Sequence, residues 1–181
     1  MTTTYFQFEA DFVTSLRCIP MQVRHKLDTC GVKLKLQHWH QFDDRIRHSL
    51  VETPCDTPVA IQIYRDRLRK LVRAQTGSDP KDLPIEDEPP WSRTDAIPAD
   101  VLDWAARFDA SIAVDQWRSL DDLQRFALIK LSRSGHENKN FWPALFGFGL
   151  AVLAGSSSPV ALACSGRYRS CGSPSAPLFI A

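Results

Sequence analysis

Two stretches, "LQHWHQFDDRIRHSLV" (36–51) and "VDQWRSLDDLQRFALI" (114–129), align without a gap and place Trp39 and Trp117 78 residues apart. Both contain the pattern W-x-x-[FL]-D-D, followed by an arginine and a leucine at matching positions. Self-similarity at a fixed offset indicates a supersecondary unit that occurs twice in the chain.

The pattern itself is helical. An aliphatic residue three positions before the tryptophan starts one short helix, and the aspartate pair caps the N-terminus of a second helix, where carboxylates are favoured. The arginines Arg47 and Arg125 lie within reach of these caps, and Leu50 and Leu128 face the core. A repeated aspartate pair also suits metal or acid–base chemistry, but capping explains both copies without a ligand. We therefore predict a compact all-α domain with two helix–turn–helix units.

Other segments follow the same helical logic. The stretch "RCIPMQVRHKLDTCG" (17–31) predicts an amphipathic helix that starts at Pro20, where a missing N–H is tolerated, and stops at Gly31. Residues 57–77 predict a longer helix. The first helix is expected to bury Val23, Leu27 and Cys30 and to expose Arg24 and Lys26; the second is expected to bury Ile61, Tyr64, Leu68 and Leu71 and to present Arg65, Arg69, Lys70 and Arg73.

Two segments break the helical pattern. Residues 78–98 are rich in proline and acidic side chains and predict an extended strap, with Glu86, Asp87 and Glu88 against the basic helix and Trp91 anchored in the core. Residues 151–181 contain no acidic residue and no sustained apolar period, so we expect a disordered tail. The helical domain is accordingly assigned to residues 1–150.

Composition excludes several classes of function. The 181 residues carry a net charge of +1, which argues against nucleic acid and anionic membranes as partners. The apolar run 141–154 is shorter than the roughly 20 residues of a membrane span. The N-terminal "MTTTYFQFEADF" carries Glu9 and Asp11 where a signal peptide is apolar, so we expect a cytoplasmic protein.

The cysteines do not form a recognised metal pattern. No C-x-x-C pair occurs, and the odd count prevents complete internal pairing. We expect Cys18 and Cys30 to be buried structural thiols. A metal or iron–sulfur carrier that uses Cys18, Cys30 and Cys55 is an alternative. The five cysteines are Cys18, Cys30, Cys55, Cys164 and Cys171.

No catalytic motif emerges either. His136 and Glu137 begin an H-E-x-x-H pattern, but Asn140 occupies the position of the second histidine. Asn138 and Asn140 are instead typical of a turn and cap before "FWPAL". We predict no catalytic residue, no cofactor and no metal site, and hence no enzyme. An enzyme would need a polar cluster such as His136, Glu137, Arg125 and a cysteine in one pocket.

Three segments together suggest a family. They are "FQFEADFVTSLRCIPMQVRHKLDTCGVKLKLQHW", "DDLQRFALIKLSRSGHENKNFWPAL" and the closing "FGL", and they resemble the nitrate reductase-associated protein family over about residues 5 to 150. The chain departs from the family at Phe146 and Gly147, where the family carries charged residues. The tail 151–181 has no counterpart in the family.

The resemblance implies an accessory role in nitrate assimilation, in which the protein binds assimilatory nitrate reductase or supports its maturation. Partners are then the reductase or its maturation factors. The contact surface is expected where the front "RCIPMQVR" segment and the "GHENKNFW" segment mix polar groups with apolar anchors. The candidate partner-binding residues are Arg17, Met21, Arg24, Arg125, His136, Glu137, Asn138 and Trp142.

Overall fold

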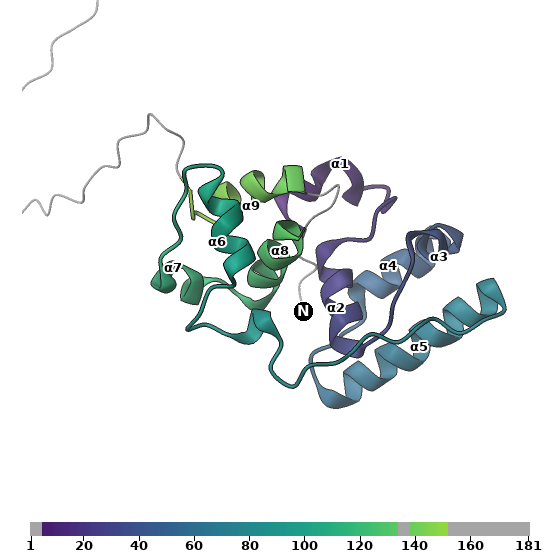
Figure 1. The fold of residues 1–181 in the computed structure, drawn as a ribbon. Helices are drawn as coiled ribbons and strands as arrows, with labels where there is room; N and C mark the ends of the chain where they lie inside the picture. The colour runs from purple at the N-terminus through teal and green to yellow at the C-terminus, as the bar shows by residue number, and fades with distance from the viewer. Residues whose placement is uncertain (1–4, 134–137, 152–181) are drawn as a thin grey trace, which may run out of the picture.

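A computed structural model describes residues 5–133 and 138–151, and these residues form nine α-helices, three short 3-10 helices (η) and no strand. The all-α prediction is confirmed (Figure 1). In chain order the elements are η1 (Gln7–Glu9), α1 (Ala10–Val13), α2 (Met21–Cys30), α3 (Leu36–Gln41), α4 (Asp44–Glu52), α5 (Pro58–Thr76), η2 (Pro90–Ser92), α6 (Ala99–Ala106), α7 (Val114–Ser119), α8 (Asp122–Ser132), η3 (Asn138–Asn140) and α9 (Phe141–Gly147).

The helices bury two separate hydrophobic clusters. The first cluster lies among α2, α3, α4 and α5 and is centred on Trp39, Tyr64 and Leu68. The second lies among α6 to α9 and is centred on Trp117 and Phe126. In Figure 1 the two helix groups form two halves that meet along α2 and α8. The fold therefore has a front half and a back half, each with one copy of the repeated pattern.

The N-terminal segment belongs to the back half, although it begins the chain. The ring of Phe6 stacks on Phe8 at 5.2 Å and meets Phe148 edge-on at 5.0 Å. Helix α2 then leads into the front half and packs against α4 and α5 on one side and α8 on the other. Both halves consequently share α2 as a common wall.

Helix α2 ends where the sequence predicts. Gly31 has a φ of +66°, a left-handed conformation that favours glycine at a helix C-terminus. A Cβ at this position would also approach Cγ1 of Ile85 to 2.6 Å. The start differs by one residue, since Pro20 is the N-cap rather than the first helical residue. Val23, Leu27 and Cys30 are buried as expected.

Both copies of the repeated pattern form a short helix followed by a second helix, and the hydrogen bonds that their N-cap aspartates accept match. The carboxylates of Asp43 and Asp121 each accept a 2.7 Å hydrogen bond, from the backbone N–H of Ile46 and of Gln124 respectively. Trp39 and Trp117 are fully buried. The local structure expected from the pattern is thus present twice.

The strap between the halves deviates from the prediction. Helix α5 ends at Thr76 with Gly77 as its C-cap, and the chain returns at once along the same helix. Asp79 therefore pairs with Arg73, and Asp82 pairs with Arg65 and Arg69 at 2.7 Å each. The expected contact between Glu86–Glu88 and the basic helix is wrong, because the acids nearest to the turn already occupy it.

Three further expectations need correction or lie outside the structure. In α5 the buried stripe is Tyr64, Leu68 and Val72, whereas Leu71 is only partly buried. Asn140 does precede α9, but its side chain makes no capping hydrogen bond. Beyond Ala151, the predicted tail lies outside the described residues.

Candidate functional site

Helix α2 organises two hollows, one at its N-terminus and one along its side. The N-terminus lacks a cap of its own, because Pro20 has no side-chain acceptor. The buried carboxylate of Glu9 serves instead: it accepts hydrogen bonds from the backbone N–H of Met21 at 2.7 Å and of Phe6 at 3.1 Å. A negative charge is stabilised near a helix N-terminus by the helix dipole. Glu9 therefore attaches the N-terminal segment to the start of α2.

The smaller hollow, of about 290 Å³, lies beside this N-terminus. Here the structure brings together the front "RCIPMQVR" segment and η3, which comes directly before α9. Arg17, Arg24 and Lys139 contribute three cations, against Asp11 and the internally bonded Glu9. Arg24 donates from Nε to the carbonyl of Ile19 at 3.0 Å. We call this hollow and its basic rim the front surface.

The candidate partner-binding residues divide into three groups. Arg17 is exposed, Arg24 is half-buried, and Trp142 is half-buried against Phe108, with ring centroids 5.4 Å apart. Met21 is buried at the start of α2. His136 and Glu137 lie outside the described residues, as does the side chain of Asn138, whose backbone begins η3.

Arg125 is an internal cap and presents no side chain to a partner in this structure. Only 4% of the residue is exposed. The guanidinium donates from Nε to the carbonyl of Trp91 at 2.7 Å and from Nη1 to the carbonyls of Leu120 and Trp117 at the end of α7. Its place in the contact surface was therefore wrongly expected, because the repeated arginine satisfies helix carbonyls rather than solvent.

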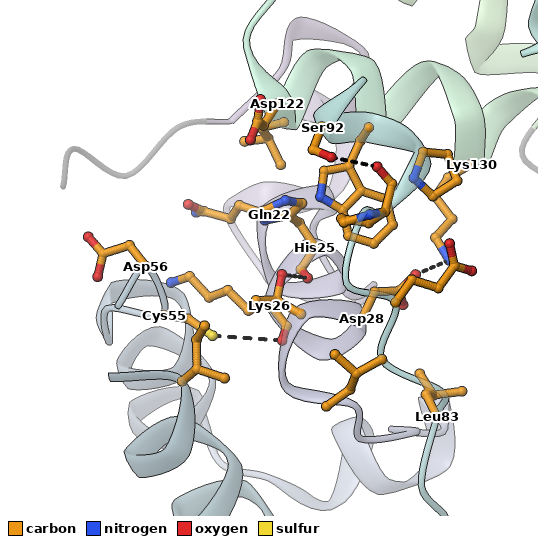
Figure 2. A pocket seen from close by; sticks show the side chains of 18 of the residues that line it. Gln22, His25, Lys26, Asp28, Cys55, Asp56, Leu83, Ser92, Asp122 and Lys130 are labelled. Atoms are coloured by element: carbon orange, nitrogen blue, oxygen red, sulfur yellow. Dashed lines mark hydrogen bonds and ion pairs between the residues drawn. The ribbon is translucent and has the colours of Figure 1, made fainter. Parts of the chain in front are cut away.

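The larger hollow, of about 920 Å³, lies between the two halves along the side of α2. Figure 2 shows Gln22, His25 and Lys26 of α2 between Asp56 on one side and Asp122 on the other. Further walls come from the end of α4, the strap at 83–92 and the start of α8. We call this hollow the interlobe cleft.

Two basic residues of α2 bind opposite halves across this cleft. Lys26 donates from Nζ to the carbonyls of Val51 and Thr53, at 2.5 and 2.7 Å, and so caps the C-terminus of α4. The ring of His25 lies edge-on to Phe126 and to Trp91, with centroids 5.1 and 5.5 Å apart. The expectation that Lys26 belongs to a solvated face is wrong, because the terminal carbonyls of α4 draw its ammonium inward.

Burial governs the protonation of both groups. Desolvation lowers the pKa of His25 and outweighs the carboxylates of Asp122 and Asp28, which raise it. Desolvation likewise lowers the pKa of Lys26, although Cys55 and Asp56 oppose the shift. Lys130, which also lines the cleft, pairs with Asp28 at 2.5 Å.

The cysteines of the front half are free thiols with unequal burial. Cys30 and Cys55 are buried, and desolvation raises their thiol pKa values to about 11 and about 12. Cys18 is only half-buried and borders the front surface, so its expected burial is wrong. Within residues 5–133 and 138–151, no three His, Cys, Asp or Glu side chains gather as they would around a metal ion.

The cleft was not identified from the sequence. Trp91 does pack on the back core, as expected of an aromatic residue in a polar strap. The cleft forms only because the strap crosses between the two halves and places its acids near His25 and Lys26. No local sequence pattern predicts the path of the strap. The one available signal was the position of Lys26 within a segment that carries the family resemblance.

A membrane-spanning element is also absent from the part of the chain that the structure describes: none of its helices combines sufficient length with sufficient apolarity.

Comparison with known proteins provides the assignment. No curated protein and no solved structure matches the chain significantly. A family model, described as conserved nitrate reductase-associated protein, matches residues 5–148. The match spans every helix of the described structure and both hollows beside α2. The chain therefore belongs to the family of conserved nitrate reductase-associated proteins.

Proposed function

We propose that this protein is a cytoplasmic accessory factor of nitrate assimilation, which binds assimilatory nitrate reductase or a factor that matures it. In this role it catalyses no reaction and carries no cofactor. The observation that carries the proposal is membership of the nitrate reductase-associated family over residues 5–148.

The front surface supports a binding role. Arg17 and Lys139 are exposed beside the apolar side chains of Phe8 and Phe12, and this mixture of charge and apolar area is characteristic of protein interfaces. Its basic rim suits an acidic patch on the partner. Trp142 and Arg24 extend the proposed surface, and His136, Glu137 and Asn138 adjoin Lys139 in the sequence.

The state of the thiols favours binding over metal or cluster transfer. Metals and clusters are held by thiolates, and a thiol whose pKa is raised stays protonated at neutral pH. Burial raises the thiol pKa values of Cys30 and Cys55 in this way. The carrier alternative therefore has less support than an accessory role.

A deletion strain tests the proposal at the level of the pathway. Loss of the gene should lower nitrate reductase activity while the reductase transcript persists. Purified tagged protein should also recover the reductase or a maturation factor from nitrate-grown cells. Unchanged growth on nitrate, together with no reductase or maturation factor in the pull-down, would contradict the proposal.

A matched pair of variants tests the surface. The double substitution Arg17→Glu and Lys139→Glu reverses the rim charge of the front surface, and we expect binding to weaken by about tenfold. The control, Arg45→Glu with Lys70→Glu, makes the same charge change at exposed positions on α4 and α5. Equal binding by both variants, with unchanged melting temperatures, would assign the contact elsewhere.

A further inference from the structure

The interlobe cleft has the size and the walls of a binding groove. Its volume of about 920 Å³ lies at the upper end of the range for small-ligand pockets. The strap is fixed on both sides of the opening: the N–H of Leu83 donates to the carbonyl of Gly31 at 3.0 Å, and Arg125 binds the carbonyl of Trp91. Hydrogen bonds thus fix the strap backbone at both ends of the groove.

The charge of the groove is negative. Six carboxylates and three cations line it, a formal balance of −3. Two of the cations are already engaged, since Lys26 binds the carbonyls of Val51 and Thr53, and Lys130 pairs with Asp28. Because the Lys130–Asp28 pair is neutral as a whole, the other acids and cations of the groove still carry the formal balance of −3.

Three of the acids are available to a ligand. Glu52 at the end of α4, Asp56 in the following turn and Glu86 in the strap are all exposed. Within the described part of the chain none of them takes part in an ion pair or a side-chain hydrogen bond. They sit on separate segments around the opening, which suits charges spread along a chain better than one compact cation.

Apolar side chains accompany the acids. Ile85 of the strap lines the groove, and 59% of this residue is exposed. Ile61, Leu83 and Trp91 continue this apolar surface into the groove. The combination of a tryptophan wall and an acidic rim is complementary to apolar anchors flanked by arginine or lysine.

We infer that the interlobe cleft binds a basic polypeptide segment of a partner protein, with its apolar side chains against Ile85 and Trp91 and its cations at Glu52, Asp56 and Glu86. This surface is distinct from the basic front surface, which suits the opposite charge. The inference is independent of the proposed function, because it is argued from the charge and the apolar walls of the cleft alone. Its test also uses no reductase.

The test measures peptide binding to the full-length protein by fluorescence anisotropy. The probe is a short labelled peptide in which arginine and leucine alternate, and the matched probe has glutamate in place of arginine. We expect binding of the basic probe only, weakened by salt. The triple variant Glu52→Gln, Asp56→Asn, Glu86→Gln should bind it about tenfold less tightly, since each exposed charge pair contributes modestly.

A charge-matched control separates the groove from the overall field of the protein. Glu88→Gln, Asp95→Asn and Asp103→Asn neutralise three exposed acids that do not line the cleft, one of them two residues from Glu86 in the same strap. This control should bind as the unmodified protein does.

NMR of the indole N–H groups supplies a second measurement. We expect the resonance of Trp91 to shift when the basic probe binds to the unmodified protein, and Trp91→Phe identifies that resonance by removing it. Equal affinity of the triple variant and the control would overturn the inference.

Two further results would assign the groove to another occupant and equally overturn it. Arg167 and Arg169 of the same chain follow the helical domain, and tighter probe binding after Arg167→Gln with Arg169→Gln would show competition from within the chain. A homodimer that dissociates in the triple variant would make a second copy the occupant.

Discussion

The two copies of the repeated pattern share their local structure but differ in their surroundings. In the first copy, α4 buries only Leu50 and Val51, and it packs against α2. In the second copy, α8 packs against α2, α6, α9 and η2, and seven of its residues are buried. Comparable sequences therefore produce the same N-cap hydrogen bond, and we expect the number of packed neighbours to influence how much each repeated position contributes to stability.

The paired arginines provide the largest expected difference. Arg125 satisfies the carbonyls of Trp91 and Leu120 in a buried setting, whereas Arg47 binds those of Trp39 and His40 near solvent. Arg125→Met leaves buried carbonyls without donors and should lower the free energy of unfolding by about 3 kcal/mol. Arg47→Met should lower it by about 1 kcal/mol, because water can replace the guanidinium.

Urea denaturation of the two variants checks this difference, and methionine keeps most of the aliphatic stem in each case. Equal losses would mean that the two copies bear equal shares of stability, so that the difference in burial has no energetic consequence.

The paired tryptophans should show the opposite order. The indole N–H of Trp39 donates to the buried carbonyl of Leu16 at 2.6 Å, whereas that of Trp117 donates to the partly exposed carbonyl of Arg93 at 3.0 Å. Leu16 also has a positive φ of 45°, which this bond helps to hold. Trp39→Phe should therefore cost about 2 kcal/mol and Trp117→Phe about 1 kcal/mol.

Thermal unfolding of both phenylalanine variants measures the difference. A larger loss of stability for Trp117→Phe would mean that packing in the back half determines the cost of each substitution in the repeat. The hydrogen bond of each indole would then be secondary.

The paired N-caps should differ least among the repeated positions. Asp121 and Gln124 form a reciprocal capping box, because the N–H of Asp121 donates to Oε1 of Gln124 at 2.9 Å. Asp43 accepts one bond, from Ile46, without such a return. Asp121→Ala should cost about 1.5 kcal/mol and Asp43→Ala about 1 kcal/mol.

The double variant Asp121→Ala with Gln124→Ala supplies the control in equilibrium unfolding. If it is no less stable than Asp121→Ala alone, the return bond contributes nothing and the two copies are energetically alike at this position.

Features set by neighbouring residues in the chain were predictable, and features set by the return of distant segments were not. The helical repeat, the Asp43 and Asp121 caps and the Gly31 stop follow from local chemistry. The burial of Arg125 and Lys26 does not, because both cations serve carbonyls at the ends of other helices. In the sequence, a basic residue outside the apolar stripe of a helix is expected to be exposed to solvent. Only the structure shows whether a backbone carbonyl from another helix accepts its hydrogen bonds and so keeps it buried.

The candidate surfaces divide in the same way. The meeting of the front segment with Lys139 was expected from two polar segments beside apolar anchors, and the structure brings them to one hollow. The interlobe cleft was missed, because its acids come from α4, the strap and α8, which only tertiary packing brings together.

The smallest expected effect is a pH dependence that acts on one side of α2 only. His25 contacts Phe126 in the second copy, whereas the neighbouring Lys26 caps α4 in the first copy. Burial lowers the pKa of His25 below its ordinary value of 6.5 in the folded protein. Below that value the unfolded chain binds the additional proton more readily than the folded chain does.

The free energy of unfolding should therefore fall as the pH drops from about 7 through 6.5 toward the folded-state pKa of His25, and this contribution should be complete below that pKa. His25→Phe removes the titrating group and keeps an aromatic ring against Trp91 and Phe126, so its stability should be flatter across this window. The control is His48→Phe, at an exposed position of α4, which should retain the slope.

Amide hydrogen exchange then locates the effect, since loss of the His25 contacts should loosen the α2–α8 packing before the α2–α4 packing. If exchange accelerates equally in α4 and α8 as the pH falls, or if His25→Phe keeps the full slope, the two halves respond as one unit. The contrast between the copies would then be confined to their static packing.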